Sequence, residues 1–310
     1  MAFPDLTVMP SPSLPRNLSV EVSSSSPTCG APPAFVESAA RAGLPGWREA
    51  GSGRPLLLLH GWSVSGEAFD GQRALALHGY RVIAPDHAGH GLSAALRPSG
   101  ATIARLAADL AALMHHLALD DAVVVGWSMG AMVAWELMRS HADLPIAMIG
   151  SIDMTPRLVT SADWPHGLHG RYDTAQAAQM AEHIRQDWES LMAPVAAGLW
   201  AAGTRADAAR TRDVMRMMRQ CTPGTLAALW EDMARQDFRV LLQAARWPLF
   251  HLYGEHSRLY APAVGRATLA LHPAARFATI PGTGHAPHLE RPDATNAALL
   301  QMLRAQESTR

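Results

Sequence analysis

The chain has 310 residues, 48% of them hydrophobic, which is enough for one large α/β domain with an insertion or for two modest domains. Its 26 arginines nearly balance 27 aspartates and glutamates, so the net charge of −1 implies no basic face for nucleic acid. Two cysteines, Cys29 and Cys221, make no disulfide framework, and no apolar run approaches the roughly 20 residues of a membrane span. We expect a cytoplasmic protein without a signal peptide.

The predicted elements begin after a Ser/Pro-rich extension, residues 1–33, which we expect to be disordered. Apolar runs predict strands at 46–50, 56–59, 81–84, 123–127 and 145–152. Helical spacing predicts helices at 68–77, 103–119 and 129–140. Strand–helix alternation with connections of this length builds a parallel sheet with helices on both faces.

The strand pattern stops between about residues 157 and 245, where alanine, methionine, tryptophan and arginine dominate. Helical periodicity there covers 175–191, 194–202 and 206–218. Alternation then returns, with strands at 248–253 and 276–280 and helices at 262–271 and 292–305. We therefore expect an α/β core formed by residues 34–156 and 246–310, with a helical cap at 157–245.

A candidate nucleophile lies in the Gly-x-Ser-x-Gly pattern of residues 126–130, which follows an apolar strand and precedes a helix. This strand–turn–helix context is what a nucleophile elbow requires, because the turn exposes the Ser128 hydroxyl above the sheet. The small residues Gly126 and Gly130 suit the crowded turn. The N–H of Met129, at the start of the helix, would point toward a developing oxyanion.

The candidate base is His285, which lies in a glycine-rich loop after the last predicted strand. In a parallel sheet that loop falls at the carboxyl edge, the same edge as Ser128. We expect the N–H of Trp62, which follows Gly61, to be the second oxyanion donor beside that of Met129. His60 is interpreted as a structural residue that ties loops together, and His288 as a residue that caps or lines the site.

Four motifs together resemble the α/β-hydrolase superfamily over about residues 45–305: HGW at 60–62, DHAGHGLS at 86–93, GWSMG at 126–130 and GTGH at 282–285. Within it, the HGW and GWS motifs and the stretch PLFHLYG at 248–254 resemble pimeloyl-acyl carrier protein methyl ester esterases. The resemblance implies the α/β-hydrolase fold, with a mostly parallel sheet flanked by helices and a helical cap insertion. It also implies a serine esterase.

The sequence departs from the family pattern at the triad acid. Members usually carry Asp three residues after the glycine that ends the strand near 253, and here Ser257 occupies that position. One interpretation makes Asp153 the acid, since some α/β-hydrolases place it at the end of the preceding strand; its alternative role is that of a turn residue before a proline. In a second, Glu255 bends in from the usual loop, and in a third there is no acid.

We expect a serine hydrolase that cleaves a carboxylic ester through Ser128, His285 and Asp153. The alternatives are a thioesterase or lactonase, a cofactor-free perhydrolase, a carbon–carbon bond hydrolase, or a ligand-binding sensor on the same scaffold. The partner would be a small-molecule acyl ester, free or bound to an acyl carrier. No dinucleotide, P-loop or metal-ligand motif is present in the sequence, so no cofactor or metal is expected.

Overall fold

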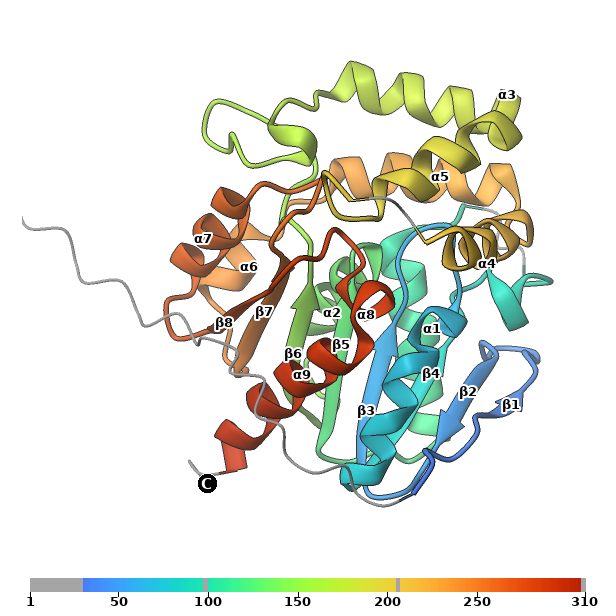
Figure 1. Cartoon of the computed structure of the whole chain (residues 1–310), viewed down its shortest axis with the longest axis vertical. Helices are drawn as coiled ribbons and strands as arrows, with labels where there is room; N and C mark the ends of the chain where they lie inside the picture. Colours follow the sequence, from blue (N-terminus) through green and yellow to red (C-terminus); the bar gives the residue numbers. More distant parts are fainter. Residues whose placement is uncertain (1–29, 97–99, 205–206, 308–310) are drawn as a thin grey trace, which may run out of the picture.

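The computed structural model describes residues 30–96, 100–204 and 207–307 (Figure 1). Most of the expected extension, residues 1–29 with Cys29, lies outside the described residues. The sheet has eight strands in the order β1-β2-β4-β3-β5-β6-β7-β8. They are β1 (Val36–Ser38), β2 (Trp47–Ala50), β3 (Arg54–Leu59), β4 (Tyr80–Pro85), β5 (Ala122–Trp127), β6 (Ile146–Ile152), β7 (Leu249–Gly254) and β8 (Arg276–Ile280).

The mostly parallel α/β sheet expected from the sequence is confirmed. From β4 to β8 every neighbouring pair is parallel, whereas β2 runs antiparallel to β4 and β1 antiparallel to β2. The central strands β3 and β5 pair Leu57 with Val124, and both side chains are fully buried. These continuous apolar runs fit strands that are covered on both faces. All parallel strands therefore bring their carboxyl ends to one edge.

Helices cover both faces of the sheet (Figure 1). One face carries η1 (Gly66–His78), α8 (Pro287–Glu290) and α9 (Pro292–Glu307), and the other carries α1 (Ile103–His116), α2 (Met129–Ser140) and α7 (Pro262–Leu271). The helix expected at 68–77 is a 3₁₀ helix with a kink at Phe69. β1 and α8 were not predicted, because three- and four-residue elements are too short to show a period.

Four α-helices connect β6 to β7; the first three lie above the carboxyl ends of the strands, whereas the fourth lies beside α7 (Figure 1). They are α3 (Thr174–Gly198), α4 (Ala208–Arg219), α5 (Pro223–Arg235) and α6 (Arg239–Gln243), and we call them the insertion helices. The two helices expected at 175–191 and 194–202 form one element, α3, which contains Pro194. Its break lies earlier, at Asp187, whose side chain accepts a hydrogen bond from the Ser190 N–H, as a helix N-cap does.

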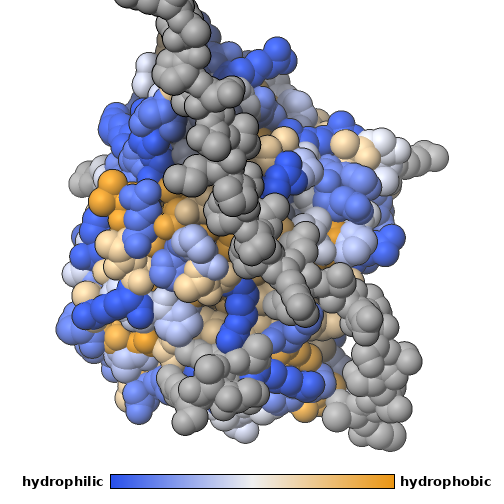
Figure 2. Space-filling view, turned by 90° about the vertical axis from the view of Figure 1, so that its left-hand side faces the viewer, coloured by the Kyte–Doolittle hydropathy of each residue, from blue (hydrophilic) through white to orange (hydrophobic). Residues whose placement is uncertain are grey.

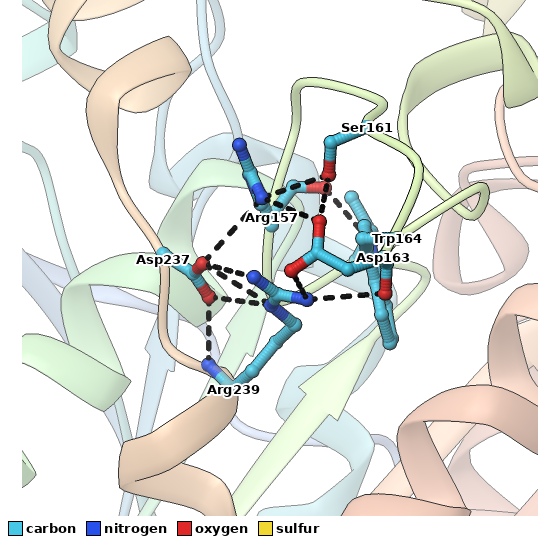
Figure 3. Close-up of polar contacts among 7 residues, drawn as sticks. Arg157, Ser161, Asp163, Trp164, Asp237 and Arg239 are labelled. Carbon is cyan, nitrogen blue, oxygen red and sulfur yellow. Dashed lines mark hydrogen bonds and ion pairs between the residues drawn. The ribbon is translucent and has the colours of Figure 1, made fainter.

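A polar cluster joins the two ends of the insertion to each other (Figure 3). The guanidinium of Arg239, at the start of α6, bonds Asp237 at 2.7 Å and Asp163, in the loop after β6, at 2.9 Å. The neighbouring Phe238 N–H donates to the Pro156 carbonyl at 3.0 Å. Exposed ion pairs contribute little individually, so we attribute to this network a role in fixing geometry.

The surface on the side of α7 and β8 is mostly hydrophilic, with small separate apolar patches (Figure 2). Among the described residues, the exposed large hydrophobic side chains are Val36 and Val240. No helix within residues 30–96, 100–204 and 207–307 has the length and apolar character needed to span a membrane.

Buried histidines predict a loss of stability in mild acid. Burial lowers the pKa of His87 and His288 to about 3 and that of His90 and His251 to about 4, and it also lowers the pKa of His60. The unfolded chain, with histidine pKa values of about 6.5, binds these protons more readily, so stability falls as pH drops below about 6.5.

Two buried carboxyls act in the opposite sense, because burial raises the pKa of Asp86 to about 6 and also raises the pKa of Asp153. Because the buried histidines outnumber these carboxyls, we expect the free energy of unfolding to fall as pH drops from about 6 toward 4. Urea unfolding across this range measures this fall. We expect His251→Gln to reduce it and His78→Gln, at an exposed site, to leave it unchanged; a flat unfolding free energy would contradict this assignment.

Candidate active site

Ser128 lies on a strained turn between β5 and α2. Its backbone has a φ of 53° and a ψ of −123°, a left-handed conformation that is uncommon for a residue other than glycine. The turn is held by hydrogen bonds from the Ser128 N–H to the Ile152 carbonyl at 3.0 Å and from the Ala131 N–H to the Ser128 carbonyl at 2.8 Å. This arrangement fits the nucleophile elbow expected from the sequence.

The flanking glycines are required by close backbone approach. A Cβ on Gly126 would lie 2.1 Å from the Gly130 carbonyl oxygen, and one on Gly130 would lie 2.1 Å from the Leu59 carbonyl oxygen. Met129 is the first residue of α2, so its N–H belongs to the first turn, whose amides have no partner within the helix. It is therefore free of the helix ladder, as an oxyanion donor must be.

The loop after β3 carries Trp62 beside the elbow. A Cβ on Gly61 would lie 3.3 Å from the Ser128 Cβ, which places this loop directly against the serine. His60 holds the loop: its Nδ1–H donates to the Gly61 carbonyl at 2.8 Å, and its Nε2 accepts from the His87 N–H at 2.9 Å. Both of its ring nitrogens thus serve the structural role that the sequence suggested.

His285 meets Asp153 at the carboxyl edge of the sheet. The His285 Nδ1–H donates to the Asp153 Oδ1 at 2.8 Å, and both side chains are almost completely buried. The His285 carbonyl accepts a hydrogen bond from the Trp127 indole N–H at 2.7 Å. The residue before Ser128 therefore fixes the backbone of His285 next to the elbow.

Three donors converge on the Asp153 carboxylate. The Gly254 N–H bonds Oδ2 at 2.8 Å, and the Ser257 hydroxyl bonds Oδ1 at 2.9 Å, beside the ring of His285. Burial raises the pKa of Asp153, whereas the hydrogen bond from His285 is the largest influence in the opposite direction. Ser257, at the position usual for the acid, thus supports a carboxylate from the neighbouring strand end. The sequence analysis gave it no such role.

Two other candidate residues lie away from this centre. The Glu255 carboxylate accepts from the Gly282 N–H at 2.8 Å and lies 3.5 Å from the His256 ring nitrogen, so in this structure it does not bond the His285 ring. His288 does not line the cavity at Ser128, contrary to expectation. Its ring packs between those of Phe69 and Trp127, with centroid distances of 4.8 Å to Phe69 and 4.5 Å to Trp127, because it lies on α8, behind the histidine loop.

The sequence analysis missed Glu290, which clamps the loop of His285. Its carboxylate accepts hydrogen bonds from the backbone N–H of Gly284, next to His285, and from that of Ala201, just after α3, at 3.0 Å for the latter. Its pKa is raised by partial burial, against the influence of these two amides. The only signal in the sequence was an acidic residue five positions after His285. That spacing alone indicates no role, because the role depends on contacts that only the structure shows.

A cavity of about 510 Å³ opens over Ser128 and His285, a size typical of small-molecule sites. Its floor includes Trp62 and Trp127 of the core, and its roof is formed by residues of α3 and α5. The site thus combines a serine at an elbow, a carboxylate-bound histidine and two backbone N–H candidates beneath this cavity. Such a constellation suits attack on an acyl carbon.

The sequence profile of the alpha/beta hydrolase family matches residues 56–298. The pimeloyl-[acyl-carrier protein] methyl ester esterase of Aromatoleum aromaticum is 31% identical over 243 residues, which cover 77% of this chain and 93% of that protein. A non-heme haloperoxidase of Rhodococcus erythropolis is 30% identical over 266 residues, covering 83% and 94%.

Solved structures show the same architecture. A thermophilic esterase from Thermogutta terrifontis superimposes with a TM-score of 0.74 at 27% identity, covering 88% of this chain and 98% of that chain. A bromoperoxidase from Bacillus anthracis superimposes with a TM-score of 0.79 at 24% identity, covering 87% and 100%, and at that identity the likeness concerns the fold alone.

Proposed function

Because this chain belongs to the alpha/beta hydrolase family, we propose that it is a serine hydrolase of carboxylic esters, with Ser128, His285 and Asp153 as its triad. The observation that carries the proposal is the 2.8 Å hydrogen bond from the His285 Nδ1–H to Asp153, at the edge where Ser128 lines the same cavity as the imidazole. This bond leaves Nε2 unprotonated and able to accept the serine proton.

In the proposed reaction His285 Nε2 takes the Ser128 proton while Oγ attacks the ester carbonyl carbon. The N–H groups of Trp62 and Met129 stabilise the tetrahedral oxyanion, and Asp153 stabilises the imidazolium. Collapse of the intermediate breaks the bond to the alkoxy oxygen, and His285 gives its proton to the departing alcohol. Water, deprotonated by the same histidine, then hydrolyses the acyl-enzyme and releases the acid.

The substrate is proposed to be a small-molecule ester held beneath the insertion helices, which act as a cap. The names of several relatives include an acyl carrier protein, and they support a carrier-bound acyl ester as one form of that substrate. Apolar residues such as Leu191 and Val195 of α3 would contact its chain.

The test combines turnover with labelling. The protein should hydrolyse p-nitrophenyl esters from acetate to octanoate, and a fluorophosphonate should modify one residue per chain, located at Ser128 by peptide mass spectrometry. Uptake of the label at Ser128 without turnover of any ester would overturn the esterase in favour of a binding protein. A label at another serine would overturn the proposed site.

Glu290 is expected to act as a positioning residue for His285. The Glu290 carboxylate accepts one hydrogen bond on each of its oxygens. In Glu290→Gln the amide NH₂ therefore faces one of the two N–H donors, which repels it, and the loop that carries His285 shifts. Misplacement of about 1 Å can cost about 10²-fold in rate, and we expect kcat to fall by about 10- to 100-fold with a smaller change in KM. Asp293→Asn, at an exposed site on α9, is the control. A lower melting temperature with unchanged kcat would reduce Glu290 to a structural role.

A further inference from the structure

The described lining of the cavity over Ser128 contains three histidines but no permanently charged side chain. Among the described residues that line it, none is lysine, arginine, aspartate or glutamate. Gln179 and His183, on the first half of α3, are exposed and lie at its outer end, whereas the inner wall is apolar. A carboxylate or ammonium group bound inside would therefore lose its hydration without gaining a charged partner, and burial of an unpaired charge is strongly unfavourable.

Aromatic rings form much of the inner wall, and their polar atoms bond other protein groups. The indole N–H of Trp62 donates to the Leu226 carbonyl at 2.9 Å, and that of Trp230 donates to the Tyr172 hydroxyl at 2.9 Å. The Tyr260 hydroxyl contacts the Met154 sulfur at 3.2 Å. The polar atoms of these three rings are therefore already paired, and these contacts hold the rings in place before a ligand arrives.

The rings are also packed against one another at the angles that aromatic groups prefer. The centroids of Trp62 and Trp230 are 5.0 Å apart at 58°, and those of Tyr172 and Trp230 are 6.1 Å apart at 87°. A ring that enters this wall can make further edge-to-face and offset contacts, which contribute beyond the area they bury. A linear alkyl chain makes no such contacts.

Resting on the proposed ester hydrolysis, we infer that the site takes uncharged esters that carry an aromatic ring and rejects esters with a charged group in the cavity. The reaction remains hydrolysis at Ser128, and the ring lies between the aromatic wall and the apolar face of α3. The lining disfavours an ester with a charged group because it offers no charged partner, and the preformed aromatic wall favours an ester with a ring.

Ring preference is tested with esters of ten carbons. The kcat/KM of methyl 3-phenylpropanoate and of its isomer 2-phenylethyl acetate is compared with that of methyl nonanoate. At least one aromatic isomer should exceed the linear ester by about 10-fold, in line with the worth of aromatic pairs. Trp230→Leu should lower this ratio, and the ratio cancels any loss common to both substrates. Equal kcat/KM values for the ring and linear esters would overturn the inference.

Charge rejection is tested with two esters of matched shape, methyl 3-(4-methylphenyl)propanoate and methyl 3-(4-carboxyphenyl)propanoate. The carboxylate should lower kcat/KM by at least about 100-fold, because it loses water without a partner. Met180→Lys places an ammonium on the cavity wall and should narrow the gap, whereas Met180→Gln, of similar length and no charge, should not. Similar rates for both esters in the wild type would contradict the inference.

The failure of this inference is distinguishable from failure of the esterase proposal. Vinyl acetate has a two-carbon acyl group and no ring, so its turnover, together with labelling of Ser128, reports on the chemistry without a group that reaches the aromatic wall. If it is hydrolysed while ring and charge preferences are absent, the esterase stands and the substrate class is wrong. If neither turnover nor labelling occurs, the esterase proposal itself fails.

Discussion

Replacement of Ser128 by alanine is expected to lower kcat for p-nitrophenyl esters by about 10⁶-fold, the loss known when a triad nucleophile is removed. The reason is that the covalent intermediate can no longer form, while the oxyanion donors still bind the ester. Ser128 lies at a strained turn with a φ of 53°, and the alanine that replaces it must adopt the same backbone conformation. Steady-state kinetics at matched melting temperature measure the effect.

Ser140→Ala provides the matched control, because Ser140 is an exposed serine at the other end of α2. It should keep wild-type kcat. A Ser128→Ala enzyme that retains more than about 1% of wild-type turnover after purification to homogeneity would exclude Ser128 as the nucleophile, since residual catalysis from binding and oxyanion donors alone is far smaller.

Asp153→Asn is expected to lower kcat by about 10⁴-fold without unfolding the protein. Three donors converge on this carboxylate, so an amide NH₂ there faces the Gly254 N–H, the Ser257 hydroxyl or the His285 ring. The histidine then accepts at Nδ1 and carries its proton on Nε2, the tautomer that cannot deprotonate Ser128. Asparagine tolerates the positive φ of 46° at this position.

Glu255→Gln is the control for the competing acid and should change kcat less than about 2-fold, because its amide oxygen can still accept from Gly282. Two further variants, Asp153→Gly and the double variant Asp153→Gly with Ser257→Asp, test whether a carboxylate at the usual position can replace Asp153. Ser257→Asp in an Asp153→Gly background should recover at least about 10-fold of the lost kcat, since the Ser257 hydroxyl already lies 2.9 Å from the oxygen that bonds His285. A 10⁴-fold loss in Glu255→Gln, with none in Asp153→Asn, would reverse the assignment.

Much of the fold could be predicted because its signals are local. The continuous apolar runs of β3 and β5 indicate strands buried on both faces, and the loss of strand pattern after residue 157 marks the insertion helices. α3 shows the limit of such signals. Pro194 was expected to begin a helix, yet the break occurs at Asp187. There the side chain accepts a hydrogen bond from the Ser190 N–H, as an N-cap residue does, and the backbone leaves the helical conformation.

Local turn chemistry likewise indicated the positions of Ser128, His285 and Trp62, because each follows a strand at the carboxyl edge of a parallel sheet. The glycines beside them are sequence features with a steric cause that the structure makes explicit: a Cβ on Gly130 would lie 2.1 Å from a backbone oxygen. These expectations needed only the order of elements and the small residues between them.

The identity of the acid could not be decided in this way. The sequence favoured Asp153 as the acid, but Asp153 also suited a turn before Thr155 and Pro156, and Glu255 lay nearer the usual position. Only the packing of β6 beside β7 brings Asp153 within 2.8 Å of a histidine 132 residues later and supplies two further donors from residues 254 and 257. A hydrogen bond depends on distances of a few tenths of an ångström between distant segments, and no local pattern encodes them.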